Sequence, residues 1–150
     1  MTRRMKAVVL ALAFGAVLVG CETAVSDDGE RSSKLTQQDW IADTINGKEV
    51  IHPGRVTMSF VEGRVSGRGG CNLYSGPVEI GDGTIKVGPL ISTKMACVDN
   101  GLMQQESVYL NALQSAQRYS FSGDGKLTIT TARGALVYHG EPRQQRPEGS

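Results

Sequence analysis

The side chains of this sequence with the widest chemistry are three cysteines, Cys21, Cys71 and Cys97. A thiol can be acylated, bind zinc, exchange electrons or form a disulfide. No Cys-x-x-Cys redox motif is present, and the cysteines have no closely spaced partner ligands, because His52 and His139 stand far away in the sequence. We therefore expect no metal site and no cofactor. Acylation and disulfide formation remain.

Cys21 follows Leu18-Val19-Gly20 at the end of an uncharged run from Ala7, and three basic residues precede that run (Arg3, Arg4 and Lys6). A positive segment followed by a short apolar one is typical of a secretory signal, and the run is too short to span a membrane. The tetrapeptide ending at Cys21 resembles a lipobox. The sequence predicts a lipoprotein signal peptide over 1–20, cleavage before Cys21, and lipidation of Cys21 that anchors the chain to a membrane. The alternative is an ordinary cleaved signal in which Cys21 is accidental.

With Cys21 assigned to the lipid, Cys71 and Cys97 remain as a pair in an exported, oxidising compartment. Such a pair is expected to form a disulfide, which would constrain the unfolded chain by about 3 to 4 kcal/mol. The alternative is two buried thiols.

Residues for enzymatic catalysis are not grouped along the sequence. In Gly63-Arg64-Val65-Ser66-Gly67 the serine stands one place too late for a nucleophile elbow. His52 precedes a proline and His139 ends a strand-like segment, so both are expected at the surface or satisfied by neighbours. We predict no catalytic residues and no enzymatic activity.

Length and charge limit the remaining classes of protein. Removing residues 1–20 leaves 130 residues, which is one domain's worth of chain. Three of the 16 basic residues lie in the signal, so 13 basic and 15 acidic residues remain and the net charge is −2. That balance, without a cluster of Lys or Arg, argues against a nucleic-acid partner.

Composition divides the rest of the chain into three parts. Residues 21–37 are charged and Ser-rich with almost nothing to bury, which predicts a flexible tether. Residues 141–150 contain two prolines and no apolar side chain, which predicts a disordered tail. The folded body is then 38–140.

Alternating apolar and polar residues between glycine-containing turns predict short antiparallel strands in the body. Val56, Met58 and Phe60, for example, alternate with mostly polar neighbours. The expected strands are 40–45, 49–51, 55–61, 64–70, 73–80, 84–89, 119–122, 126–130 and 135–139.

One amphipathic helix is expected over Gly101–Arg118, where Leu102, Tyr109, Leu113 and Ala116 share one side of a helical wheel. Asp99 or Asn100 can cap its start. Its apolar side must pack on the sheet. The fold class is therefore α+β and mostly β.

Motifs along the body resemble the META domain family, which includes HslJ-like heat-shock proteins. Trp40 and Asn46-Gly47 open the body, Gly67-Arg68-Gly69-Gly70-Cys71-Asn72 follows, and Ser92-Thr93-Lys94-Met95-Ala96-Cys97 precedes Glu106 in the helix. The resemblance covers nearly all of 38–140. It implies a strongly curved antiparallel sheet or cracked barrel with one helix against it, no established enzymatic activity, and links to stress, drug resistance of the novobiocin type, virulence or motility.

The motif residues are expected to be structural. Gly67, Gly69 and Gly70 indicate a bend or close backbone crossing rather than a phosphate-binding loop. Asn72 tolerates left-handed backbone angles and can bond to nearby backbone, and Met95 and Met103 are expected to fill core gaps. Glu106, the one polar residue in the apolar stripe, is predicted to accept hydrogen bonds from Ser92 or Thr93, or to pair with Lys94 or Arg68.

Three functions remain open. The first is a lipid-anchored interaction module of the cell envelope, acting in the stress response, with an unidentified protein partner. The second is a carrier of a small apolar ligand in a cavity lined by Leu102, Leu113 and Phe60. The third is an inhibitor of a periplasmic enzyme that uses the loop 51–54 or 98–101.

The residue after the lipidated cysteine is Glu22 and not an aspartate, which favours the periplasmic face of the outer membrane. The alternative is the cell membrane.

Overall fold

The computed structural model describes residues 27–95 and 97–143. The predicted signal peptide, Cys21 and most of the predicted tail lie outside these residues.

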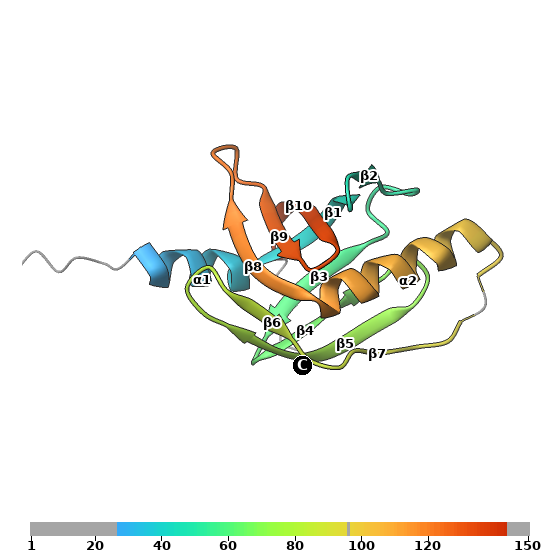
Figure 1. Cartoon of the computed structure of the whole chain (residues 1–150), viewed down its shortest axis with the longest axis horizontal. Coiled ribbons are helices and arrows are strands. Elements are labelled where there is room, and N and C mark those ends of the chain that lie inside the picture. Colours follow the sequence, from blue (N-terminus) through green and yellow to red (C-terminus); the bar gives the residue numbers. More distant parts are fainter. Residues whose placement is uncertain (1–26, 96, 144–150) are drawn as a thin grey trace, which may run out of the picture.

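One curved antiparallel sheet makes up most of the molecule (Figure 1). Its main path runs β6-β5-β4-β3-β1-β10-β9-β8, while β2 pairs with β1 and β7 pairs with β5. The strands are β1 (Gln38–Ile45), β2 (Lys48–Glu49), β3 (Thr57–Val61), β4 (Arg64–Arg68), β5 (Leu73–Ile80), β6 (Ile85–Val87), β7 (Ile91–Ser92), β8 (Ala116–Phe121), β9 (Leu127–Thr131) and β10 (Gly134–Pro142).

The two ends of this path meet, so that the sheet is almost a closed barrel. Thr84 and Arg118 form an isolated antiparallel bridge, and the Tyr119 N–H donates to the Gly83 carbonyl at 2.9 Å. The predicted class, a mostly β fold with a strongly curved sheet or cracked barrel and an amphipathic helix against it, is confirmed.

Two helices accompany the sheet, α1 (Asp27–Gln37) and α2 (Asn100–Gln114). Figure 1 shows α2 lying across the sheet, with α1 at the other end of the long axis from the start of α2. The helix α2 turns Leu102, Tyr109 and Leu113 inward, as its apolar stripe predicts, and all three are buried. Trp40, Tyr109 and Tyr138 are the largest side chains without exposed surface, and they fill the interior from β1, α2 and β10.

Glycine-containing turns set the register of the hairpins. Asn46-Gly47 and Glu62-Gly63 have positive φ angles at both positions, 50° and 79° in the first and 48° and 72° in the second. Two consecutive positive φ angles are the geometry of a tight hairpin turn whose twist matches that of the strands. The turn at Glu62-Gly63 therefore pairs Val61 with Arg64 and fixes which side chains of β4 face outward.

The prediction of a flexible tether over 21–37 is wrong for residues 27–37, which form α1. One apolar residue holds this polar helix in place. Leu35 is fully buried, its carbonyl accepts a hydrogen bond from Trp40 Nε1 at 2.9 Å, and Lys34 Nζ lies 4.6 Å from the centre of the Phe121 ring. Average composition does not reveal a helix that depends on a single leucine.

Other elements also differ in their bounds from the sequence prediction. The helix α2 ends at Gln114, before the predicted Arg118, because the N–H of Ser115 bonds back to Ala112 and Leu113 and the chain continues directly into β8. The predicted strand over 84–89 is shorter, and β7 was not predicted. The strand β10 continues to Pro142, so the first residues of the predicted tail belong to the sheet.

Neither helix within 27–95 and 97–143 is long and apolar enough to cross a membrane.

Substituting Gly67 tests the close contact between β3 and β4. A Cβ atom at Gly67 would lie 2.0 Å from the Thr57 carbonyl oxygen, so one strand would have to move. We expect Gly67→Ala to lower the free energy of unfolding by about 3 kcal/mol, measured by urea denaturation. The matched control is Gly123→Ala, whose Cβ would meet no atom within 4 Å and which should change stability by less than about 0.5 kcal/mol. Equal effects of the two substitutions would contradict this account.

Candidate functional site

The carboxylate of Glu106 lies at the centre of the predicted motif. Its side chain is 7% exposed, and it is the one buried charged side chain among the described residues. Oε2 accepts hydrogen bonds from the backbone N–H of Cys71 at 2.9 Å and of Asn72 at 2.6 Å, and Oε1 accepts from Asn72 Nδ2 at 2.7 Å. Glu106 thus joins α2 to the turn between β4 and β5.

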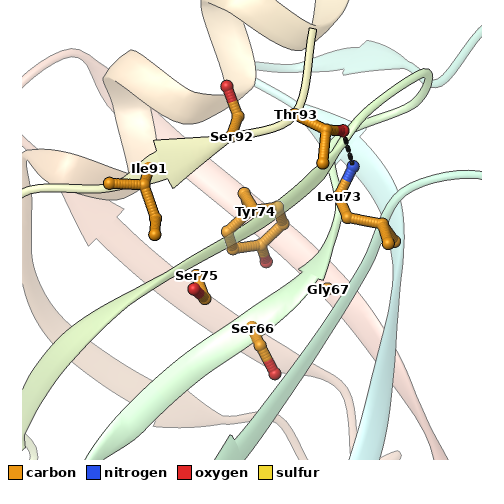
Figure 2. Close-up of a pocket in the computed structure, with 8 residues that line it drawn as sticks. All are labelled: Ser66, Gly67, Leu73, Tyr74, Ser75, Ile91, Ser92 and Thr93. Carbon is orange, nitrogen blue, oxygen red and sulfur yellow. Dashed lines mark hydrogen bonds between the residues drawn. The ribbon is translucent and has the colours of Figure 1, made fainter. Parts of the chain in front are cut away.

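Asn72 continues this network toward the segment that precedes α2. Its Oδ1 accepts from the Met95 N–H at 2.6 Å and from Thr93 Oγ1 at 3.1 Å. The hydroxyl of Thr93 in turn accepts from the N–H of Leu73 at 3.1 Å, the bond dashed in Figure 2. Three separate parts of the chain therefore meet at one amide side chain.

The partners of Glu106 differ from those predicted. Neither Ser92, Thr93, Lys94 nor Arg68 bonds to its carboxylate; the donors are Cys71 and Asn72. The reason is the turn that follows the glycines, which directs two consecutive backbone N–H groups toward α2, where no strand can accept from them. Asn72 is not among the residues with positive φ, so its role is the bonding and not the left-handed backbone.

The glycines before Cys71 make room for α2. A Cβ at Gly69 would lie 2.8 Å from Glu106 Cγ, and a Cβ at Gly70, whose φ is 134°, would lie 3.1 Å from Leu102 Cδ1. These two glycines admit side chains of α2, whereas the close backbone crossing that the sequence predicts lies at Gly67, beside the Thr57 carbonyl.

A disulfide joins Cys71 to Cys97, with 6.2 Å between their Cα atoms. It fastens the segment leading into α2 to the same turn that Glu106 holds. Met95 and Met103, which were expected in the core, are instead 52% and 43% exposed. The segment from Thr93 to Met95 runs along the surface, so a methionine there has no core gap to fill.

Three buried tyrosines form a second polar cluster, which the sequence analysis did not identify. The hydroxyl of Tyr109 lies 2.8 Å from that of Tyr74 and 3.3 Å from that of Tyr138, and Tyr74 also donates to the Thr57 carbonyl at 2.9 Å. Burial raises the pKa of Tyr109 to about 12 and raises the pKa values of Tyr74 and Tyr138 well above their ordinary value. Burial thus favours the neutral, protonated form of all three hydroxyls inside the core.

Both histidines pair with aspartates at the surface, as expected. His139 Nδ1 lies 2.6 Å from Asp43 Oδ1, and Lys126 Nζ lies 3.1 Å from Asp43 Oδ2. Burial raises the pKa of Asp43, but the hydrogen bonds and charges of His139 and Lys126 outweigh it and hold that pKa below its usual range. His52 Nε2 lies 3.4 Å from Asp99 Oδ2, while Asp99 Oδ1 caps α2.

No group of three or more His, Cys, Asp or Glu side chains in the described part of the chain could hold a metal ion.

An open hollow of about 540 Å³ lies on the sheet where β4, β5 and β7 adjoin; we call it the outer groove (Figure 2). The register of these strands places Ser66 opposite Ser75 and Ser75 opposite Ile91, and places Leu73 opposite Arg68. The serines make a shallow floor, while Leu73 and Ile91 stand above it with 52% and 68% of their surfaces exposed. The lining residues are Ser66, Gly67, Leu73, Tyr74, Ser75, Ile91, Ser92 and Thr93.

Sequence reasoning considered Ser66 only as a failed nucleophile and missed the groove. The signal was present in the alternation of β4 and β5, since Ser66 and Ser75 share the outward face of a hairpin. The contribution of β7 (Ile91–Ser92) was not identified from the sequence.

Substituting Glu106 tests the bonds that join α2 to the turn. In Glu106→Gln an NH2 group replaces one of the two carboxylate oxygens that accept from Cys71 and Asn72. At least one of these buried donors therefore loses its acceptor. We expect the free energy of unfolding to fall by about 3 kcal/mol, measured by thermal and urea denaturation. Glu79→Gln is the control, because Glu79 is exposed and lies 3.9 Å from Lys86, and it should change stability by less than about 0.5 kcal/mol. A Glu106→Gln protein as stable as the wild type would refute the role given to this carboxylate.

Known proteins are similar to this chain in both sequence and fold. The model of the META domain matches residues 33–142. Heat shock protein HslJ of Escherichia coli (strain K12) is 25% identical over 139 residues, which cover 89% of this chain and 95% of HslJ. An NMR structure of a protein from Burkholderia xenovorans superposes with a TM-score of 0.59 at 25% identity, covering 75% of this chain and 88% of the other.

A second NMR structure superposes with a TM-score of 0.58 at 26% identity and covers 71% of this chain and 92% of its own. The resemblance drawn from the glycine and cysteine motifs is confirmed by these matches. Because the family model spans most of the sequence, this chain belongs to the META domain family.

Proposed function

We propose that this chain is a lipid-anchored, non-enzymatic interaction module of the bacterial cell envelope, with an accessory role in stress or drug resistance of the novobiocin type. Its place is the periplasmic face of the outer membrane, with the cell membrane as the alternative. Acyl chains on Cys21 anchor it, and the folded body meets a protein partner.

The observation that carries the non-enzymatic role is the burial of Glu106. An acid or base in catalysis must be within reach of the substrate. Glu106 is 7% exposed and its two oxygens accept three hydrogen bonds from Cys71 and Asn72, and the three buried tyrosines bond to one another and to backbone. The META domain family is also not known for enzymatic activity.

The surface supports a role in binding. Three apolar side chains are more than half exposed: Leu73, Ile91 and Val98, the last of them fully. Exposed apolar surface on a folded domain is typical of sites that contact other molecules. HslJ, the curated relative, carries the name heat shock protein, which supports a role in stress.

Two observations bear on the other functions. The loops 51–54 and 98–101 lie side by side, since His52 bonds to Asp99 and a Cβ at Gly101 would be 3.5 Å from Ile51 Cδ1. This favours an enzyme inhibitor as the second candidate. Leu102, Leu113 and Phe60, which a carrier would place around a cavity, are at most 5% exposed and belong to the packed interior, which disfavours a carrier.

The lipid anchor is tested by intact mass and cell fractionation. We expect the native protein to lack residues 1–20 and to carry the added mass of acyl chains, and we expect Cys21→Ser to lose that mass and leave the membrane fraction. The double variant Cys71→Ser/Cys97→Ser is the control and should remain acylated, because the disulfide is not part of the anchor. An unmodified Cys21 in the native protein would overturn the anchoring.

The non-enzymatic role is tested by complementation of a deletion strain exposed to novobiocin. We expect the wild-type gene to restore growth, and a His52→Gln/His139→Gln variant to restore it equally, because neither ring is needed for chemistry. Cys21→Ser should fail to restore growth. Loss of rescue in the folded histidine variant would indicate catalysis and contradict the proposal.

A further inference from the structure

Two arginines flank the outer groove. Arg64, Ser66 and Arg68 alternate along β4, so their side chains share its outward face, and the Cα atoms of the two arginines are about 13 Å apart at the usual rise of a strand. Arg64 lies opposite Pro77 and Arg68 opposite Leu73. An extended arginine at either position can therefore reach over Ser66.

Neither arginine forms an ion pair with a carboxylate of the described residues, whereas Arg143 pairs with Asp39 at 3.2 Å. Arg64 Nη2 instead donates to Ser75 Oγ at 3.2 Å, which places its guanidinium over the floor of the groove. The exposed Lys94, beyond Thr93, likewise forms no ion pair with a described carboxylate.

The groove thus combines groups that can bind an anion with an apolar surface next to them. A guanidinium offers paired donors that match the two oxygens of a carboxylate, and serine hydroxyls can donate to the same group. Leu73 and Ile91 lie next to this floor and offer the most exposed apolar surface of β5 and β7.

We propose that the outer groove binds an acidic segment of a partner protein. One carboxylate side chain of the partner lies over Ser66 between Arg64 and Arg68, and a neighbouring apolar side chain lies against Leu73 and Ile91. The assignment rests on the proposed interaction function and names the chemistry of its partner.

The shape of the groove and the charge of the chain favour a peptide over other anions. A lipid tail needs an enclosed apolar cavity, and this hollow is open. A nucleic acid needs a broad basic surface, whereas the chain after residue 20 has 13 basic and 15 acidic residues.

The test measures binding of fluorescent octapeptides to the purified protein in detergent micelles by anisotropy. The probes alternate Glu with Val, Lys with Val, or Ser with Val. We expect saturable binding of the Glu-Val peptide only, weakened about tenfold or more by Arg64→Glu/Arg68→Glu and by raising the salt from 0.05 to 0.5 M. The matched control is Arg55→Glu/Arg133→Glu, which reverses two exposed arginines outside the groove and should leave the affinity within twofold.

A second variant keeps the test decisive if charge reversal disturbs the fold. Leu73→Ser/Ile91→Ser removes the apolar contact and should weaken binding about fivefold with the circular dichroism spectrum unchanged. Equal affinity in the groove and control variants, equal binding of the Lys-Val peptide, or no binding of the Glu-Val peptide would overturn the proposal. So would complete displacement of the peptide by an equal concentration of inorganic phosphate, because the groove would then accept any anion.

Failure of this assignment is distinguishable from failure of the proposed function. The peptide measurements depend neither on acylation of Cys21 nor on growth with novobiocin. If binding fails while the wild-type gene still restores growth and the native protein is acylated, the interaction module stands and its partner binds elsewhere.

Discussion

The carboxylate of Glu106 is the polar contact that joins α2 to the sheet. Glu106 reaches from α2 into the turn after β4 and takes up two backbone N–H groups that no strand could satisfy. Leaving such donors unpaired inside the protein costs more than the hydrogen bonds are worth when made, so the turn and the helix are stable only together. The neighbouring features follow from this contact. Gly69 and Gly70 lack side chains so that Glu106 and Leu102 can approach, the Asn72 amide extends the network to the segment before the helix, and the disulfide closes the same loop covalently.

Local rules were sufficient for the strands but not for the elements that depend on tertiary contact. Alternation and positive-φ turns predicted all but one of the strands, because the period of a strand and the conformation of a hairpin are properties of adjacent residues. The helix α1 was missed because it depends on the burial of Leu35 and on the hydrogen bond from Trp40 Nε1 to the Leu35 carbonyl, which are tertiary contacts. The partners of Glu106 were missed for a similar reason: Cys71 and Asn72 are 35 and 34 residues away, and the conformation of their turn is set by the barrel.

The candidate binding site was hidden at the level of the sequence because its parts come from three strands. Ser66, Ser75 and Ile91 are brought into one row only by the register of β4, β5 and β7. In contrast, polar residues that stand out in the sequence, such as Asn72 and Glu106, form hydrogen bonds within the fold. In this domain Asn72 and Glu106 of the family motif join parts of the fold, whereas outward side chains of the same strands, Arg68 of the motif among them, line or flank the groove.

The pairing of β1 with β10 sets the order of events in folding. These strands are hydrogen-bonded from Gln38 with Pro142 to Ile45 with Leu136, so the middle of the sheet is made from the two ends of the domain. Without β10, β1 has only β3 and the short β2 as partners, and the sheet around Trp40 is open. Pairings this distant in sequence form late and slowly, because the intervening loop must be closed before they give any stability. We therefore expect the pairing of β10 with β1 to be the slow step of folding.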